Sequence, residues 1–457
     1  MPKRQQPRPR KPDPKLLARL KKPAAPATPE KHPAVQDLAS VAGGLFASGH
    51  LSAAFDAYQR LVKHDRSNRL AHLTMAAILG HDGQLENGMG LMRGYFEEFP
   101  LDSGRAAPER PLVLRMRGFH KTRPIVFKSS GGFRPRLRGG HFTTQFLLLQ
   151  PDFALRTYTI ANDNIARVGI PIEHDLIINT IAEPDIEGRS LEAFTKHLEA
   201  NPSAPVINNP HNVWHTARDR NYERLKDTDR LTFPETRRIS FEKAEAPEVL
   251  RRVAELGVDL PFIIREAGTQ TGRTTQLVTN VFELETYAKD GLDGDYFVIA
   301  YRQILWNRKY FRKLRLFQID GEFYPVVCHI DQVWNVHGGN RKEIMRTDEA
   351  LMAEEKAFLS DWRSYVGPGN AEHLYWLAEV TGLDFFGIDF TIDNEGKIFI
   401  YELNPAMRHS FDHAKNFPYK MEHDLNTSEA FMRMVRSRLP ADWAGHKRPA
   451  PKAVAPI

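Results

Sequence analysis

The chain has 457 residues, 41% of them hydrophobic and 26% charged, which is ordinary for a globular protein and leaves room for about three domains. No apolar run approaches the roughly 18 residues that span a bilayer, and the basic N-terminus lacks the apolar segment of a secretory signal. A single cysteine, Cys328, excludes an intrachain disulfide framework, so we expect a cytoplasmic protein.

The net charge of +6 is concentrated in the N-terminal tail. Residues 1–33 contain ten Lys or Arg and two acidic residues, a net charge of +8, so the remaining chain is at −2, with 53 basic and 55 acidic residues. We therefore expect no basic face for nucleic acid on the folded body. Residues 1–33 and 441–457 are rich in Pro, Lys and Ala and are predicted to be disordered.

Residues 34–105 contain an internal repeat with a period of 34 residues. Ala42 recurs as Ala76, and Gly49 recurs as Gly83. Each unit predicts a helix, a glycine-containing turn and a second helix, an all-α arrangement that resembles tetratricopeptide repeats. Two units are too few for a stable solenoid. We expect this segment to dock on the next domain, a protein partner or a second copy of the chain; the alternative is a helical cap with no binding role.

Residues 111–209 alternate short apolar runs with helical ones, which predicts an open α/β subdomain with ligands at the ends of its parallel strands. Arg134, Arg136 and Arg138 lie between two Gly-Gly pairs and are candidates for holding an anionic substrate, with a solvated basic loop as the alternative. The expected strands are Pro124–Lys128, Leu155–Ile160, Asp175–Asn179 and Pro205–Asn208.

Two apolar runs within residues 385–405 flank a polar break, which predicts an antiparallel hairpin. We take Glu395 and Gly396 as the two loop residues, so that Asn394 faces Lys397.

In this register Asp389 lies opposite Glu402, and Asn404 follows on the same face of the hairpin. Carboxylate and amide oxygens are hard ligands that suit Mg²⁺, which proteins hold by one or two carboxylates together with substrate phosphates. The hairpin is therefore a candidate metal site; the alternative is an ordinary polar face.

The sequences Gly-Ile-Asp-Phe around Asp389 and Tyr-Glu-Leu-Asn-Pro around Glu402 resemble the magnesium-binding end of the ATP-grasp superfamily, on the glutathione synthetase and RimK-like side. The resemblance implies a mixed α+β and α/β fold, with an ATP-grasp domain over residues 210–440 preceded by an α/β substrate subdomain over 111–209. It also implies ATP and two Mg²⁺ ions, with Mn²⁺ as a substitute, the metal being held by Asp389, Glu402 and Asn404.

The same resemblance implies a nucleotide site upstream of the hairpin. Arg220 and Arg265 stand where the family usually has phosphate-binding lysines, and both keep the positive charge. Gly268 and Gly272 bound the loop that would close over the triphosphate. Tyr301 and Gln303 follow the strand whose backbone would read the adenine edge.

Arg315 matches the family arginine that contacts the transferred phosphate, and Lys313 lies two residues before it. Neutralising charge on a phosphoryl group in transfer is the largest catalytic effect available to such enzymes. We therefore take both as catalytic candidates, with a solvated strand face as the alternative. His337 is a candidate base for an incoming amine, or a structural residue.

These expectations indicate an ATP-dependent, ADP-producing carboxylate–amine ligase that forms an amide or peptide bond through an acylphosphate. Its substrates would be small-molecule or peptide carboxylates and amines. Two alternatives stay open: a catalytically weak nucleotide-binding scaffold whose repeat segment binds a protein partner, and a small-molecule kinase.

Overall fold

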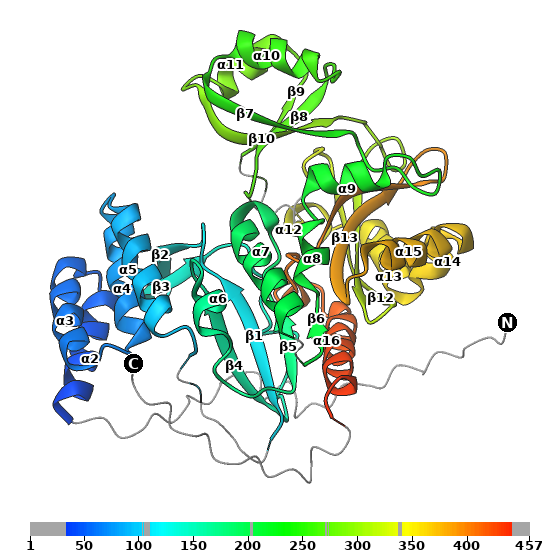
Figure 1. Ribbon diagram of the computed structural model, residues 1–457. Coiled ribbons are helices and arrows are strands. Elements are labelled where there is room, and N and C mark those ends of the chain that lie inside the picture. Colours follow the sequence, from blue (N-terminus) through cyan, green and yellow to red (C-terminus); the bar gives the residue numbers. More distant parts are fainter. Residues whose placement is uncertain are drawn as a thin grey trace.

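The computed structural model describes residues 33–102, 104, 110–201, 204–269, 272, 274–336 and 341–440, except for the side chains of residues 33–35 and 342. Nearly all of the two predicted tails, residues 1–32 and 441–457, lies outside the described residues. The candidate base His337 lies outside them as well. The protein is mixed α/β: a helical segment, a parallel sheet and two antiparallel sheets follow one another along the chain (Figure 1). None of the described helices has the length and apolar character to cross a bilayer.

The N-terminal segment is two successive helical hairpins, α2 (Pro33–Ala47) with α3 (Leu51–His64) and α4 (Arg69–His81) with α5 (Leu85–Glu98). Both turns are built alike. The His50 N–H donates to the Leu45 carbonyl (2.9 Å), and 34 residues later the Gln84 N–H donates to the Leu79 carbonyl (2.8 Å). The intervening glycines, Gly49 and Gly83, have φ of 89° and 81°, a conformation that favours glycine. The predicted helix–turn–helix units are thus present; the tetratricopeptide assignment stays a prediction.

Close approach of α4 and α5 depends on Gly88, because a Cβ built there would lie 2.4 Å from the Ala76 carbonyl oxygen. Gly88→Ala is therefore expected to lower the free energy of unfolding by about 1–3 kcal/mol, measured by urea unfolding. Gly90 on the same helix has nothing within 4 Å of such a Cβ. Gly90→Ala should instead stabilise the protein by up to about 1 kcal/mol. Equal gains from both substitutions would contradict this packing.

A two-stranded hairpin, β2 (Arg123–Ser129) and β3 (Gly132–Arg138), lies against α4 (Figure 1). The strand predicted at Pro124–Lys128 is present, but its predicted parallel pairing was wrong, because Gly132 at φ 95° turns the chain back into an antiparallel partner. The three arginines that were candidates for holding an anionic substrate occupy every second position of β3 and are exposed; they are Arg134, Arg136 and Arg138. The Arg136 guanidinium stacks over the Phe127 ring, 3.8 Å from its centroid.

The parallel sheet has the strand order β4-β1-β5-β6. The predictions for β4 (Ala154–Ile160), β5 (Leu176–Asn179) and β6 (Val206–Ile207) are confirmed as parallel strands. The central strand β1 (Leu112–Gly118) had not been predicted, since Arg115 and Arg117 interrupt its apolar run. Helix α7 (Pro184–Ala200) packs on β1 and β4 and follows the short helix α6 (Asn164–Val168).

Two short helices, α8 (Pro210–Trp214) and α9 (Arg218–Leu225), lead into an antiparallel sheet of order β7-β10-β8-β9. Apolar side chains of two helices, among them Val249 and Leu284, form a core with this sheet. The elements of this lobe, drawn at the top of Figure 1, are β7 (Thr236–Ala244), α10 (Ala246–Glu255), β8 (Phe262–Glu266), β9 (Thr275–Val278), α11 (Val281–Tyr287) and β10 (Leu292–Ala300).

The second antiparallel sheet has the order β12-β11-β13-β14. Its first hairpin turns at Asp320-Gly321, as the sequence predicts, with φ of 54° and 82°. Its strands and helices are β11 (Phe311–Ile319), β12 (Glu322–Asp331), α12 (Arg341–Ile344), α13 (Glu349–Ser360), α14 (Trp362–Val366), α15 (Pro368–Thr381), β13 (Phe385–Ile392), β14 (Ile398–Asn404), the 3₁₀ turn η1 (His413–Lys415) and α16 (Lys420–Ser437).

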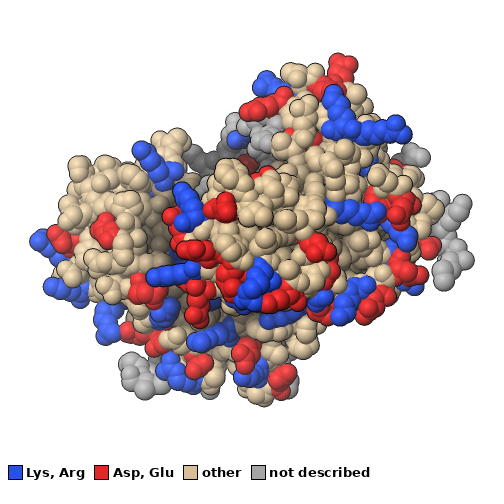
Figure 2. Space-filling model, turned by 90° about the horizontal axis from the view of Figure 1, so that it is seen from above, with Lys and Arg blue, Asp and Glu red and all other residues tan. Residues whose placement is uncertain are grey.

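Seen from above, basic and acidic side chains lie interspersed over the surface (Figure 2). Among the residues that the structure describes, this face therefore carries no continuous basic surface of the kind that binds a nucleic-acid backbone.

Candidate functional site

A cavity of about 350 Å³ is lined by residues of both antiparallel sheets. Ile263 and Ile299 come from one sheet and Phe399 from the other, and they give the cavity an apolar part. Its polar part carries charged side chains of both signs, which are Glu183, Arg218, Arg265, Arg302, Lys313, Arg315, Asp389, Glu402 and Arg408. Apolar walls next to a few convergent polar groups are typical of ligand sites.

The hairpin β13–β14 places Asp389 opposite Glu402, as predicted. The predicted loop was nevertheless wrong. Asp393, not Asn394, faces Lys397, because the Asp393 carboxylate accepts N–H groups from Glu395 and Lys397 (2.9 and 3.0 Å) and fixes a three-residue loop.

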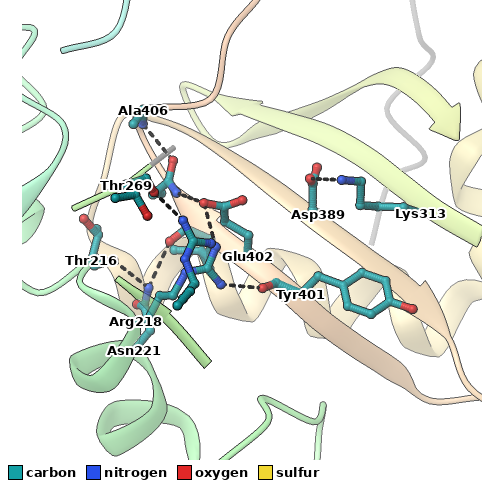
Figure 3. Close-up of polar contacts among 12 residues, drawn as sticks. Thr216, Arg218, Asn221, Thr269, Lys313, Asp389, Tyr401, Glu402 and Ala406 are labelled. Carbon is teal, nitrogen blue, oxygen red and sulfur yellow. Dashed lines mark hydrogen bonds and ion pairs between the residues drawn. The ribbon is translucent and has the colours of Figure 1, made fainter. Parts of the chain in front are cut away.

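This loop shifts the register by one residue, and a bulge between Ile400 and Glu402 restores it. Two deviations of one residue therefore cancel, and the predicted pair forms. Asp389 and Glu402 lie on the same side of the hairpin (Figure 3), and both line the cavity together with Asn404.

Asp389 is 1% exposed and is held by two cations of strand β11. Arg315 donates to both carboxylate oxygens (2.6 and 2.8 Å), and the Lys313 ammonium lies 3.3 Å away. Burial alone would raise the pKa of Asp389, but the two cations outweigh it and lower that pKa to about 2. Asp389 is thus an anion at every physiological pH.

Glu402 has its own set of partners. Arg218 lies 2.9 Å from its carboxylate and donates to the Tyr401 carbonyl at the same distance, and Asn404 donates its amide N–H (2.8 Å) (Figure 3). Burial would raise the pKa of Glu402, while Arg218 and Arg265 lower it, with a net decrease. Cations from α9 and β8 therefore meet the hairpin at this carboxylate.

Glu183 is the third carboxylate in the cavity lining and is in a different state. Burial, followed by the nearby charge of Asp185, raises the pKa of Glu183 to about 8. A carboxyl group with this pKa exchanges a proton close to neutral pH, as general acids and bases do.

Glu183→Gln should change how stability depends on pH. A folded-state pKa above the unfolded value of about 4.5 means that the folded protein binds the extra proton, so the wild type loses stability as pH rises through 8. We expect the variant to lose less, by about 2–4 kcal/mol between pH 5 and pH 9, in urea unfolding at several pH values. Parallel curves for the two proteins would contradict the raised pKa.

Three of the predicted nucleotide residues, Arg265, Gly272 and Tyr301, line the cavity. Burial and the charge of Arg218 lower the pKa of Arg265 to about 10, and its guanidinium donates to the Thr269 carbonyl. Residues 270, 271 and 273 of the glycine-bounded loop lie outside the described residues.

The structure places the other three elsewhere. The Arg220 guanidinium stacks at 3.8 Å over Trp214 and donates to the Trp214 carbonyl (2.7 Å), so it does not line the cavity. Gly268 faces Ile186 of α7, and Gln303 is an exposed residue outside the lining.

Four charged residues of the cavity lining were missed by sequence reasoning: Glu183, Arg218, Arg302 and Arg408. Arg218 begins α9 and lines the cavity beside Glu402, whereas the cation that we had expected to bind phosphate from this helix was Arg220. Glu183 precedes Pro184, the first residue of α7, shortly after β5. The rule that ligands bind at the carboxyl ends of parallel strands is a signal that could have found Glu183.

The side-chain oxygens of the hairpin suit a magnesium ion that takes only some of its ligands from the protein. No group of three or more His, Cys, Asp or Glu forms a metal site within the described ranges. Asp389 and Glu402, with the Asn404 oxygen that also accepts the Ala406 N–H (2.9 Å), supply only part of a coordination shell. This matches Mg²⁺, which usually keeps waters and substrate phosphates as its other ligands. The ion would have to compete with the cations now at both carboxylates.

Comparisons with family models and with curated proteins gave no match. Among solved structures, D-alanine–D-alanine ligase from Bacillus anthracis aligns over 71% of this chain and 98% of its own, with 10% identity and a TM-score of 0.43. D-alanyl-alanine synthetase A from Vibrio cholerae aligns over 72% of this chain and 99% of its own, with 12% identity and a TM-score of 0.39. N5-carboxyaminoimidazole ribonucleotide synthetase from Thermotoga maritima aligns over 72% of this chain and 76% of its own, with 11% identity and a TM-score of 0.37. Since all three TM-scores are below 0.5, the functional assignment rests on this chain's own residues.

Proposed function

We propose that this protein is an ATP-dependent carboxylate–amine ligase of the ATP-grasp type. The observation that supports it is the gathering of Asp389, Glu402 and Asn404 on one hairpin face in the same cavity as Arg265 and Arg315. The cavity has an apolar part for a base and a charged part for a triphosphate, and both antiparallel sheets contribute residues to each part. Asp389, Glu402 and Asn404 would hold a magnesium ion that enters with ATP, and the ion would supply neutralisation of phosphate charge.

In the reaction that we propose, a substrate carboxylate oxygen attacks the terminal phosphorus of ATP, which releases ADP and leaves an acylphosphate. Arg315, Lys313 and Arg265 hold phosphate oxygens and offset their charge during the transfer. An amine nitrogen then attacks the acyl carbon, and the carbon–oxygen bond to phosphate breaks, which releases inorganic phosphate. No nucleophile of the protein is needed.

The attacking amine must lose a proton as the amide forms. Glu183 lines the cavity, and its pKa of about 8 suits the acceptance of that proton near neutral pH. This role does not require His337, the base considered from the sequence.

The test is to incubate the protein with Mg²⁺ and ATP and with pools of amino acids and peptides, and to follow ADP and new masses. A new amide together with ADP supports the ligase. A stable phosphorylated product with ADP would instead show a kinase.

The second candidate is the nucleotide-binding scaffold, whose helical hairpins would be the working part and bind a protein partner. It is favoured by the ion pairs that Arg315, Lys313 and Arg218 make with the two candidate metal carboxylates. ATP binding without turnover across broad pools would support it over the ligase.

A further inference from the structure

A second cavity, of about 280 Å³, lies in the α/β subdomain at the carboxyl end of β1. Its lining is polar: Arg115 and Arg117 of β1 face residues of the segment that follows β3, among them His141 and Thr144. Arg115 and Arg117 are two residues apart on one strand and so point to the same side of the sheet. This is the edge at which parallel α/β sheets bind ligands.

The two arginines have no carboxylate of their own within the described part of the chain. Arg115 donates only to hydroxyl groups, those of Thr144 and Thr157 (3.0 and 2.8 Å). Arg117 makes no hydrogen bond or ion pair with another described residue. Burial and the charge of Arg69 lower the pKa of Arg117 to about 10, so it stays a cation at neutral pH.

The acidic residues that act on these arginines are bound by other donors. Asp102 is paired with Arg156 (2.8 Å). Glu187 accepts hydrogen bonds from the Thr122 hydroxyl and the Ser190 hydroxyl (2.6 and 2.7 Å), besides backbone N–H groups. The cavity thus carries two positive charges, neither of which forms an ion pair with a carboxylate of the described residues.

Two donors at the cavity lining also lack a partner among the described residues. The Arg115 Nε–H is buried and unbonded. The His141 Nε2 accepts the Gly118 N–H (2.9 Å), so in the neutral ring the proton must be on Nδ1, which is buried and unbonded as well. Unpaired buried donors are rare in native proteins and indicate a missing acceptor.

We propose that this second cavity is a binding site for the anionic group, phosphate or carboxylate, of a small molecule. Two guanidinium groups and neighbouring hydroxyls supply charge-assisted hydrogen bonds of the kind that hold such oxyanions. The second cavity is separate from the first cavity, which is the candidate nucleotide site, but lies close to it. Gly140 lies between two residues that line the second cavity, and its carbonyl accepts the N–H of Glu183 (3.1 Å), which lines the first. The proposal does not require the ligase assignment to be correct.

The test uses the full chain with inorganic phosphate and succinate as probes, in isothermal titration calorimetry. Arg117→Gln should weaken binding of the anion by about tenfold or more, the effect of losing one charge-assisted contact. In buffer free of such anions the same variant should unfold at the same or a higher temperature than the wild type, because it removes an unpaired buried charge. A purely structural Arg117 would lower that temperature.

Two matched variants isolate the site. Arg66→Gln removes the same charge from an exposed position between α3 and α4 and should bind both probes like the wild type. Arg265→Gln removes a cation from the first cavity; it should impair nucleotide use yet keep the Arg117-dependent binding. The proposal is overturned if the wild type binds neither probe, or if Arg117→Gln binds them as tightly as the wild type does.

The anion has two possible sources, a substrate of the enzyme or a separate effector. Competition between phosphate and a substrate found in the mass screen would place the group on that substrate. A change in ATP turnover without competition would identify an effector. Both results support the anion site. If the protein proves not to be a ligase, the calorimetric test of anion binding still stands, so the two proposals can fail independently.

Discussion

Glu402→Gln is expected to reduce Mg²⁺-dependent ATP turnover by about 10²-fold or more while the fold is kept. The substitution preserves the volume of the side chain and the hydrogen bond that Asn404 donates to it, while the contact with Arg218 ceases to be an ion pair. It removes the negative charge on which a divalent ion and its triphosphate would depend, and losing one preorganised electrostatic contact at a phosphoryl-transfer site costs about 10²–10³ in rate. The measurement is ADP release against magnesium concentration, with unfolding followed in parallel.

Glu395→Gln is the matched control for this experiment. Glu395 lies in the loop of the same hairpin, its side chain is 67% exposed, and among the described residues its carboxylate pairs with Arg302 at 3.6 Å. Its substitution should leave turnover unchanged. If Glu402→Gln kept the magnesium dependence of the wild type, the hairpin would not be the metal site and the ligase proposal would fail with it.

The hairpin was predictable because two apolar runs flank a polar break, and side chains alternate between the two faces of each strand. Asp389 and Glu402 are paired as the sequence predicts, although the loop between the strands is one residue longer than expected. The carboxylate of Asp393 makes that loop, and the bulge in β14 compensates for it. Because these two deviations of one residue cancel, Asp389 and Glu402 stay on the same face of the hairpin.

The sequence could not show which cation of the short helix α9 reaches the hairpin. Arg218 and Arg220 lie on the same short helix, and both carry the charge that a phosphate site needs. Which of them reaches Glu402 depends on the direction in which α9 faces the hairpin, a tertiary fact; Trp214 holds the other by stacking. Spacing along the chain cannot distinguish two cations separated by half a helical turn.

Strand β1 shows a second kind of failure. Buried central strands are expected to be apolar throughout, and Arg115 and Arg117 break that pattern. The pattern fails because one side of β1 lines a polar cavity. Departures from the folding pattern are expected at functional sites, and both departures on this strand fall on residues that line the second cavity.

Asp389→Asn is expected to lower the free energy of unfolding at pH 7 by about 3–5 kcal/mol, since it leaves Arg315 and Lys313 without the buried carboxylate that they share. Replacing both partners, as in Asp389→Asn with Arg315→Gln, should recover part of the loss, because a buried pair removed as a whole costs less than a broken one. The measurement is a urea-unfolding cycle of the wild type, the two single variants and the double variant. Additive losses would mean that the pair does not couple the strands.

The effect of Asp389→Asn should also depend on pH in a defined direction. The folded-state pKa of about 2 is below the ordinary value of 3.8, so the stabilisation by the ionised carboxylate is fully present above about pH 5 and is lost as pH falls towards 2. The difference between wild type and variant should therefore shrink between pH 5 and pH 3. Asp320→Asn is the control: this exposed turn residue pairs with Arg438, and its loss should cost less than about 1 kcal/mol. A difference for Asp389→Asn that stays constant over this range would show that packing, not charge, accounts for it.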